Sequence, residues 1–348
     1  MILPQTYAVT ILLMVFSMLC WGSWASTYKA AGWRFELYYF DFSLGLLATA
    51  TVLAFTAGSM GFDGFTFLDD LLHAGRRPLF YAFMAGVVFN LANMLLMAAI
   101  AVAGMTVAFP ISAGLALIVG VVIGLFQKPI GHPLMAFAGC VLIFAAILAA
   151  GSVYRFINEI RHEANARAGK AKSTKRPVAV KGIAISLVSG AIMAGIYPML
   201  AKAKEGEGGL GPYSVAMIFA VGAFASMFVF NLFFMNLPVE GNPIDFMDYF
   251  KASLRAHGLS ILGGMILCLG AVAGLTAASV ENIRIVPSLS YGLSQAPALI
   301  AVLWGTLVWK EVKDGDSRTK SMVALMFVLF AVGVMLVSLS QALLTPRG

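Results

Sequence analysis

Long apolar stretches alternate with short polar segments along the whole chain. Each stretch is close to the roughly 20 residues that an α-helix needs to cross the hydrocarbon core of a bilayer. The pattern predicts ten transmembrane helices, five in each half of the chain. We expect them at residues 8–26, 39–58, 79–103, 106–126, 134–154, 182–201, 213–237, 258–280, 285–309 and 321–344.

Composition supports a membrane protein. Hydrophobic residues make up 60% of the chain and charged residues only 11%, against roughly 25% charged in ordinary soluble domains. The three cysteines, Cys20, Cys140 and Cys268, fall inside expected helices, where they act as small apolar residues. We therefore expect an all-α polytopic membrane protein with no disulfide framework, no metal site and no cofactor.

Basic residues divide the chain and predict its orientation. The segment 155–181 holds eight of the 23 Lys and Arg residues, and we interpret it as a solvated, flexible connector between two five-helix halves, 1–154 and 182–348. Connectors one, three, five, seven and nine carry most of the basic residues, and short loops rich in Lys and Arg stay in the cytoplasm. The central connector is expected to be cytoplasmic and both termini outside, in a plasma (inner) membrane.

The two halves share a faint repeat. Placing Pro110 over Pro287 aligns Gly86 with Gly263 without a gap. An odd number of helices per half forces the second half to insert upside down, and inverted repeats are common in carriers that work by alternating access. The sequence therefore predicts two inverted five-helix repeats, with a solute site near the middle of the membrane.

Three segments resemble a known family. They are CWGSWAS with ELYYFDFSLGLL and AFTAGS, then AGVVFNLANMLLMAAIAVAGMTVAFPISAGLALIVG, then SQAPALIAVLWGTLVWKE. The chain resembles the drug/metabolite transporter superfamily, within it the ureide permease branch and its glucose/ribose-porter relatives. The resemblance covers most of helices one to four, eight and nine, and it implies a carrier for small polar metabolites.

Neutral polar residues on the third helix are candidates for solute binding. Asn90 and Asn93 share one helical face with Gly86 and Met97, because their spacings are three and four. A buried amide must find a hydrogen-bond partner. The two asparagines therefore either bind solute or join neighbouring helices, and the family resemblance favours a binding role for Asn93.

The ninth helix carries a similar stripe of Ser288, Tyr291 and Gln295, bracketed by Pro287 and Pro297. A proline frees a backbone carbonyl, and a broken helix at membrane depth is tolerated where it lines a cavity. We expect this stripe to bind solute, with a helix kinked for packing as the alternative.

Aromatic residues supply three further candidates. Tyr197 precedes Pro198 on the sixth helix in a weaker version of the same pattern. Trp21 and Trp24 share a face of the first helix, where they act either as interfacial anchors or as an aromatic wall against a ring-shaped solute.

Two carboxylates near hydrocarbon are candidates for proton coupling. Asp41 is expected about one turn inside the second helix, with Glu36 just before it. Ionisable groups within a membrane are functional hypotheses by default, and the alternative is an interfacial ion pair with Lys29 or Arg34. We expect Asp41, and next Glu36, to take a proton from outside.

Together these features predict a secondary active transporter, not an enzyme. The expected activity is import of a small neutral polar metabolite (ureide, nucleobase, nucleoside or sugar), coupled to protons rather than sodium, by a monomer or homodimer. Nucleic acid is not an expected partner. The alternative is an exporter of lipophilic or cationic compounds, which would need a carboxylate deep in the membrane. Catalysis within the bilayer would need paired acids or a Ser–His set, and all four histidines lie in connectors or at helix ends.

Overall fold

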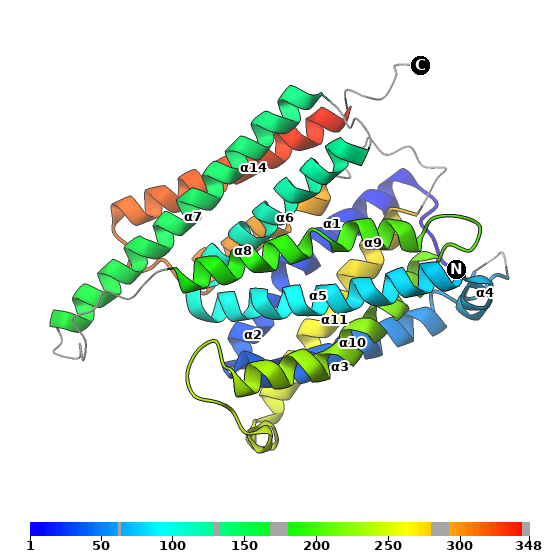
Figure 1. Ribbon diagram of the computed structural model, residues 1–348, viewed down its shortest axis with the longest axis horizontal. Helices are drawn as coiled ribbons and strands as arrows, with labels where there is room; N and C mark the ends of the chain where they lie inside the picture. Colours follow the sequence, from blue (N-terminus) through cyan, green and yellow to red (C-terminus); the bar gives the residue numbers. More distant parts are fainter. Residues whose placement is uncertain (62–63, 128–131, 168–179, 280–291, 343–348) are drawn as a thin grey trace. The chain divides into compact units, whose positions relative to one another are not determined.

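The computed structural model describes residues 1–61, 64–127, 132–167, 180–279 and 292–342 (Figure 1). Every regular element in these residues is a helix, and no strand occurs among them. Nine described helical segments are long and apolar enough to cross a membrane, from Tyr7–Ala31 to Ser317–Ser340. The protein is thus an all-helical, polytopic membrane protein.

The helices form two compact units, and each unit draws on both halves of the sequence. The first unit contains residues 1–94 and 195–286, and the second contains residues 95–194 and 287–348. The division falls inside helix α5 (Arg76–Ala103), after Met94, and between helices α8 (Lys181–Met193) and α9 (Ile196–Ala203). The units are therefore a different division from the two sequence halves.

The first unit contains most of the helices that carry buried polar residues. Besides the first part of α5 and α9, its elements are α1 (Tyr7–Ser23), α2 (Ala25–Ala31), α3 (Phe35–Phe55), α4 (Phe67–His73), α10 (Pro212–Asn236), the 3-10 helix η1 (Phe246–Lys251) and α11 (Leu254–Ala277). Local sequence sets several helix starts. Thr6 and Ser253 accept hydrogen bonds from backbone N–H groups in the first turns of α1 and α11, as N-cap residues do.

Glycines allow the helices of the first unit to approach closely. Helix α3 packs between α10 and α11. At four glycines a Cβ would collide with the backbone of the neighbouring helix, so only Gly fits these crossings. The contacts are Gly45 on Ile261, Gly264 on Phe42, Gly86 on Phe219 and Gly222 on Phe83.

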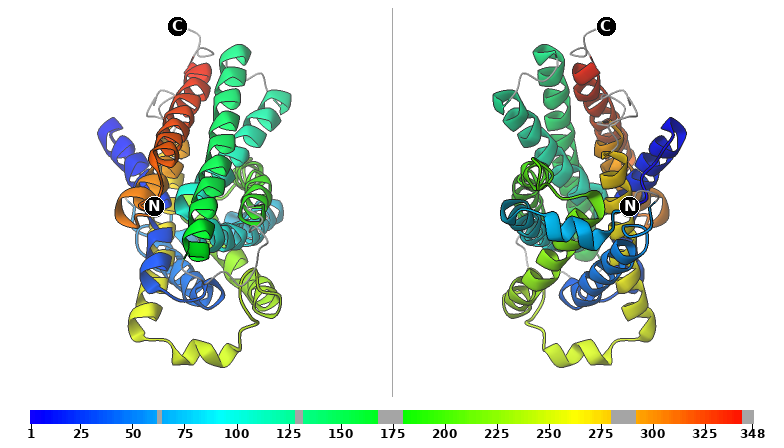
Figure 2. Two further views of the ribbon diagram at one scale, coloured as in Figure 1. Left: turned by 90° about the vertical axis from the view of Figure 1, so that its left-hand side faces the viewer. Right: turned by 90° about the vertical axis from the view of Figure 1, so that its right-hand side faces the viewer.

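The second unit contains two close helix pairs. Its elements are α6 (Met105–Gln127), α7 (Pro133–Arg167), α8, α13 (Pro297–Leu303), a π-helical turn (Trp304–Val308) and α14 (Ser317–Ala342). Helices α7 and α14 lie side by side in both views of Figure 2 and cross where Gly139 meets Gly333. Helix α6 packs against α7 and α8, and Gly190 of α8 lies on the backbone of Ser112.

One residue separates α5 from α6. Gly104 has φ +84°, in the left-handed region that favours glycine, so the chain reverses there within a single position. The carboxylate of Glu311 accepts hydrogen bonds from the backbone N–H groups of Met105 and Thr106. It therefore caps the first turn of α6, where helical N–H groups lack partners.

Several expected helices differ in detail from the structure, and the sixth is divided into α8 and α9. The expected first helix continues past residue 26 to Ala31, with Trp24 standing between α1 and α2. The fifth continues to Arg167, so the first part of the connector 155–181 is helical and not a flexible linker, while residues 168–179 lie outside the described residues. For the ninth, only Pro297–Val308 is described as an apolar helix, and residues 280–291 lie outside.

Candidate functional site

A chain of buried polar side chains joins α3, α5 and α10 inside the first unit. Nδ2 of Asn93 donates to the hydroxyl of Tyr39 at 3.1 Å, and that hydroxyl donates to the backbone oxygen of Asn90 at 3.5 Å. Nδ2 of Asn90 donates to the hydroxyl of Ser226 at 2.9 Å. The exposed fractions of Asn90, Asn93 and Tyr39 are 0%, 1% and 1%. The structure brings together the two asparagines predicted from their spacing. We call Tyr39, Asn90, Asn93 and Ser226 the amide cluster.

Two buried amides near this level of the unit keep unused hydrogen-bonding atoms. Oδ1 of Asn90 has no hydrogen-bond partner among the described residues, and neither Oδ1 nor Nδ2 of Asn231 has one. Asn231 is fully buried on α10, one turn before Phe234, whose ring contacts Phe35 of α3. A buried polar group without a partner costs about 1–3 kcal/mol. Such groups are retained where they serve a function, and binding a polar ligand is one such function.

The sequence analysis did not include Asn231 among the candidate solute-binding residues. It stands alone in the apolar run FVFNLFF, with no second polar residue at helical spacing to mark a face. Its isolation in such a run was the available signal.

Aromatic rings pack together in the same unit as the amide cluster, and the ring of its Tyr39 lies 5.0 Å from the ring of Phe42, centroid to centroid. The ring of Trp21 lies edge to face with that of Phe89, the residue before Asn90, with the ring centroids 5.9 Å apart. The ring centroids of Phe89 and Phe219 are 4.9 Å apart. Trp24 packs on Phe42 at 5.1 Å and is 1% exposed. Trp24 therefore lies in the interior of the first unit.

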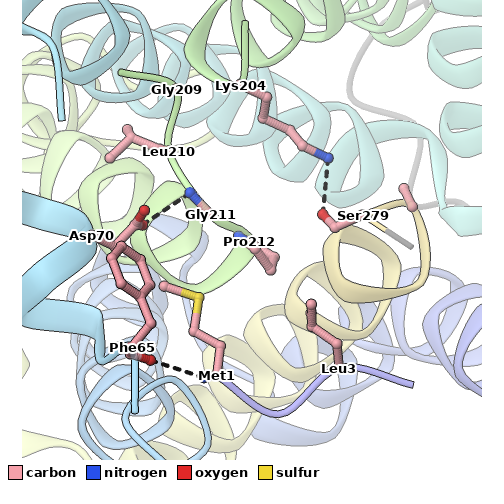
Figure 3. Close-up of a pocket in the computed structure, with 11 residues that line it drawn as sticks. Met1, Leu3, Phe65, Asp70, Lys204, Gly209, Leu210, Gly211, Pro212 and Ser279 are labelled. Atoms are coloured by element: carbon pink, nitrogen blue, oxygen red, sulfur yellow. Dashed lines mark hydrogen bonds between the residues drawn. The ribbon is translucent and has the colours of Figure 1, made fainter. Parts of the chain in front are cut away.

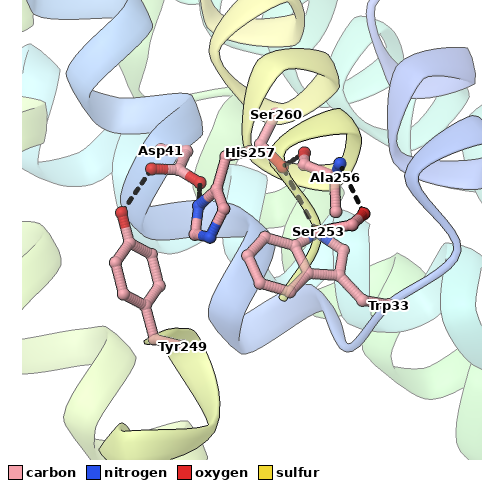
Figure 4. Close-up of polar contacts among 7 residues, drawn as sticks. All are labelled: Trp33, Asp41, Tyr249, Ser253, Ala256, His257 and Ser260. Carbon is pink, nitrogen blue, oxygen red and sulfur yellow. Dashed lines mark hydrogen bonds and ion pairs between the residues drawn. The ribbon is translucent and has the colours of Figure 1, made fainter. Parts of the chain in front are cut away.

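A second polar group forms at the start of α3. Oδ1 of Asp41 accepts a hydrogen bond of 2.5 Å from the hydroxyl of Tyr249, and its Oδ2 lies 2.6 Å from Nδ1 of His257 (Figure 4). Tyr249 comes from η1 and His257 from the first turn of α11. Burial, followed by the hydrogen bond to Asp41, raises the pKa of Tyr249, so its hydroxyl remains a donor.

Glu36, the other proton candidate, has a permanent cation beside it. Arg34 donates to both of its carboxylate oxygens, through Nη2 at 2.7 Å and Nε at 3.2 Å. The same bond raises the pKa of Arg34. The structure therefore places Glu36 in an ion pair, the alternative weighed for it from the sequence. Among the described residues, the side-chain partners of Asp41 are Tyr249 and His257.

The remaining candidates belong to the second unit, to α9 or to residues outside those described. Ser288 and Tyr291 fall in residues 280–291 and are not described. Gln295 belongs to the second unit, just before α13, and its amide donates to Ser294 at 3.3 Å. Tyr197 on α9 is 80% exposed and does not join the amide cluster.

The first unit also contains an open pocket of about 370 Å³ at its other end (Figure 3). Nζ of Lys204 donates to the hydroxyl of Ser279 at 3.0 Å, and Asp70 accepts from the N–H of Gly211 at 2.9 Å. Burial lowers the pKa of Lys204. Among the described residues no group of three or more His, Cys, Asp or Glu side chains is placed to hold a metal ion.

Comparisons with known proteins point to one class of membrane protein. No protein-family model matches the chain. Three proteins of Arabidopsis thaliana are each 21% identical to it: Ureide permease 1 over 92% of this chain and 94% of its own length, Ureide permease 2 over 97% and 99%, and Ureide permease 4 over 94% and 96%.

A solved structure described only as the crystal structure of a protein aligns with 98% of this chain and 100% of its own. The TM-score is 0.53 and the identity 15%, so this likeness shows the fold alone. The relatives are named permeases, and the alignments cover nearly their entire length. They therefore indicate a transporter rather than an enzyme. The nine membrane-spanning segments and these relatives together support a multi-pass, ureide permease-like membrane transporter.

Proposed function

We propose that this protein is a secondary active transporter that imports a small neutral polar metabolite together with protons. The solute class is a ureide, nucleobase, nucleoside or sugar. One observation carries the proposal: among the described residues, Oδ1 of Asn90 and both amide atoms of Asn231 are fully buried and have no hydrogen-bond partner. A solute with its own donors and acceptors would satisfy them, and nearby rings such as Trp21 and Phe89 suit its flat faces.

The amide cluster orients the groups that would meet the solute. The bonds from Asn93 to Tyr39 and from Asn90 to Ser226 each use Nδ2 of the amide. They hold the amide planes in place, so Oδ1 of Asn90 is fixed as an acceptor. A fixed acceptor favours solutes that present an N–H or O–H group, because it loses little entropy on binding. On the ninth helix, Ser288, Tyr291 and Gln295 remain proposed contacts.

Alternating access by two inverted repeats is part of the proposal. In support, the crossing of α3 with α11 has the same glycine arrangement as the crossing of α10 with α5. Gly45 and Gly222 are 177 positions apart, and Gly264 and Gly86 are 178 apart. The sequence alignment pairs Gly86 with Gly263, which is one position before Gly264.

Asp41 is the proposed coupling residue, because Glu36 is neutralised by Arg34. Asp41 lies near the first connector, which the distribution of basic residues assigns to the cytoplasm together with the central connector. That placement disagrees with direct protonation from outside. We therefore propose that Asp41 releases its proton to the cytoplasm in this conformation and is loaded from outside in the opposite state. The membrane would be the plasma (inner) membrane, with both termini outside.

Export of lipophilic cations is less well supported. A cation exporter needs a carboxylate free to neutralise its substrate, and both oxygens of Asp41 are already hydrogen-bonded. Among the described residues, the buried carboxylates are Glu36, Asp41 and Asp70, and none belongs to the amide cluster.

A solute screen in proteoliposomes tests the proposal. Purified protein should accumulate at least one ureide, nucleobase, nucleoside or sugar when an inward proton gradient is imposed, and the same solute should raise the melting temperature. Asn90→Ala should abolish both effects. Stabilisation by lipophilic cations alone would replace this proposal with the exporter.

A further inference from the structure

The structure assigns a partner to the proposed coupling residue: we propose that Asp41 and His257 together form one proton-binding site, and that Tyr249 on η1 closes it. This rests on the proposed proton-coupled import. His257 is 216 positions from Asp41 in the chain, and its Nδ1 lies 2.6 Å from Oδ2 of Asp41. The two side chains are 21% and 3% exposed, so the pair is shielded but not sealed.

Chemistry allows this pair to take up one proton. With Nδ1–H of His257 donating to Asp41, the other ring nitrogen, Nε2, has a free lone pair. Protonation at Nε2 converts the imidazole to imidazolium and removes the net negative charge of the pair. Histidine is the side chain whose charge changes in the physiological pH range. A buried carboxylate facing an imidazole is thus a charge that pH can switch, unlike the permanent pair of Arg34 with Glu36.

No other charge competes for Asp41 within the described residues. Its recorded partners are Tyr249 and His257. On α10, which also packs on α3, the sole titratable residue is Tyr213, near the opposite end of the helix. The other charged groups described at this end of the unit are paired, exposed or on α2. They are Arg34 with Glu36, Lys251 with Asp248, exposed Glu240, Asp245 and Arg255, and Lys29 with Tyr28 beside it.

Helix η1 covers the pair as a small flap. The ring of Tyr249 lies edge-on to His257 and to Phe40, with ring centroids 4.8 Å and 5.8 Å apart. It also stacks with Trp33, at a centroid distance of 6.2 Å. Trp33 itself meets His257 at 5.1 Å and donates to Ser260 at 3.3 Å. Figure 4 shows Tyr249 and His257 approaching the carboxylate of Asp41 from two different elements.

The flap gives protonation a structural consequence. The hydroxyl of Tyr249 donates to a carboxylate, whose negative charge strengthens the bond. When His257 becomes an imidazolium, Asp41 stays ionised, but the positive charge beside it offsets part of the negative charge at Oδ1. The bond to Tyr249 therefore weakens and η1 loosens, which opens the path to His257. Proton binding and opening of the flap are therefore linked through one oxygen, Oδ1 of Asp41.

Two variants of the full chain in proteoliposomes test the site. His257→Asn keeps a donor near the position of Nδ1 but cannot take the proton. We expect it to lose proton-driven accumulation while keeping solute exchange without a gradient. Tyr249→Phe removes a donor that favours the charged carboxylate, so the pH of half-maximal transport should move upward. His162→Asn and Tyr7→Phe, both outside the site, are matched controls and should behave as wild type.

The outcomes separate this inference from the proposed function. If wild type accumulates a solute and His257→Asn does so equally with an unchanged pH profile, the pair is not the proton site. If His257→Asn does not fold, an unshifted profile in Tyr249→Phe overturns the inference alone.

If wild type transports no solute of these classes, the proposed function fails. The pair is then judged by melting temperature. The difference between wild type and His257→Asn should vary between about pH 5 and 8, and a constant difference would refute the pair.

Discussion

Oε2 of Glu311 accepts two hydrogen bonds from Thr106, one from its backbone N–H at 2.8 Å and one from its hydroxyl at 2.6 Å. The two residues are 205 positions apart in the chain. The carboxylate lies at the start of α6, where the helix dipole favours negative charge. This bond ties the connector after the π-helical turn to the reversal between α5 and α6, all within the second unit.

Loss of the Glu311 carboxylate should destabilise the protein. Glu311→Ala leaves two N–H groups of α6 without a partner, and loss of an N-cap costs about 0.5–2 kcal/mol. We expect a lower melting temperature in detergent, with Glu311→Gln intermediate because it keeps one acceptor. An unchanged melting temperature for Glu311→Ala would mean that water replaces the cap at no cost.

Gly104→Ala should also destabilise. Its φ of +84° lies where a Cβ costs roughly 1–2 kcal/mol, and the added Cβ would meet the carboxylate of Glu311. Gly120→Ala is the matched control. Gly120 is inside α6, where an added Cβ meets nothing within 4 Å, and alanine there should stabilise by about 0.5–1 kcal/mol. Thermal unfolding of the two variants should therefore shift in opposite directions.

Asn231→Leu should separate stability from function. The side chain of Asn231 has no hydrogen-bond partner in the described residues, so an apolar replacement of similar size removes a penalty of about 1–3 kcal/mol. We expect a higher melting temperature together with weaker solute affinity. Asn236→Leu, at an exposed position of the same helix, is the control for affinity. Unaltered affinity in Asn231→Leu would assign the amide no part in binding.

Asp41→Asn should abolish accumulation against a gradient while solute exchange continues. The amide cannot carry the charge that the proton neutralises, yet it preserves the size of the side chain. Glu36→Gln is the comparison, because Glu36 is paired with Arg34; it should lower stability and leave the pH dependence of transport in place. Proton-driven accumulation by Asp41→Asn at the wild-type level would remove Asp41 from the mechanism.

Lys204→Met should stabilise the protein at neutral pH. Burial lowers the pKa of Lys204, so between its folded and unfolded pKa values the unfolded chain binds more protons, and the stability of the wild type rises with pH through that window. The advantage of the variant should therefore shrink as the pH becomes alkaline. A melting-temperature difference that stays constant with pH would show that desolvation of the ammonium is not the cause.

The sequence by itself determined the membrane class, the position of most helices and the shared face of Asn90 and Asn93. These depend on local regularities: the length of an apolar run and the periodicity of a helix, both of which are visible in neighbouring residues. The same periodicity placed Trp21 and Trp24 on one face, although it did not decide whether that face met lipid or protein.

Only the tertiary structure decided which distant side chains meet. It paired Asp41 with His257 and Tyr249, and Glu36 with Arg34. It left the amide of Asn231 without a hydrogen-bond partner among the described residues, and it placed Glu311 at the start of α6. His257, Tyr249 and Glu311 appeared in the sequence as ordinary residues of connectors or helix ends. Except for the local pair of Glu36 with Arg34, their roles come from contacts across some two hundred residues, and these depend on how helices pack, which no local pattern encodes.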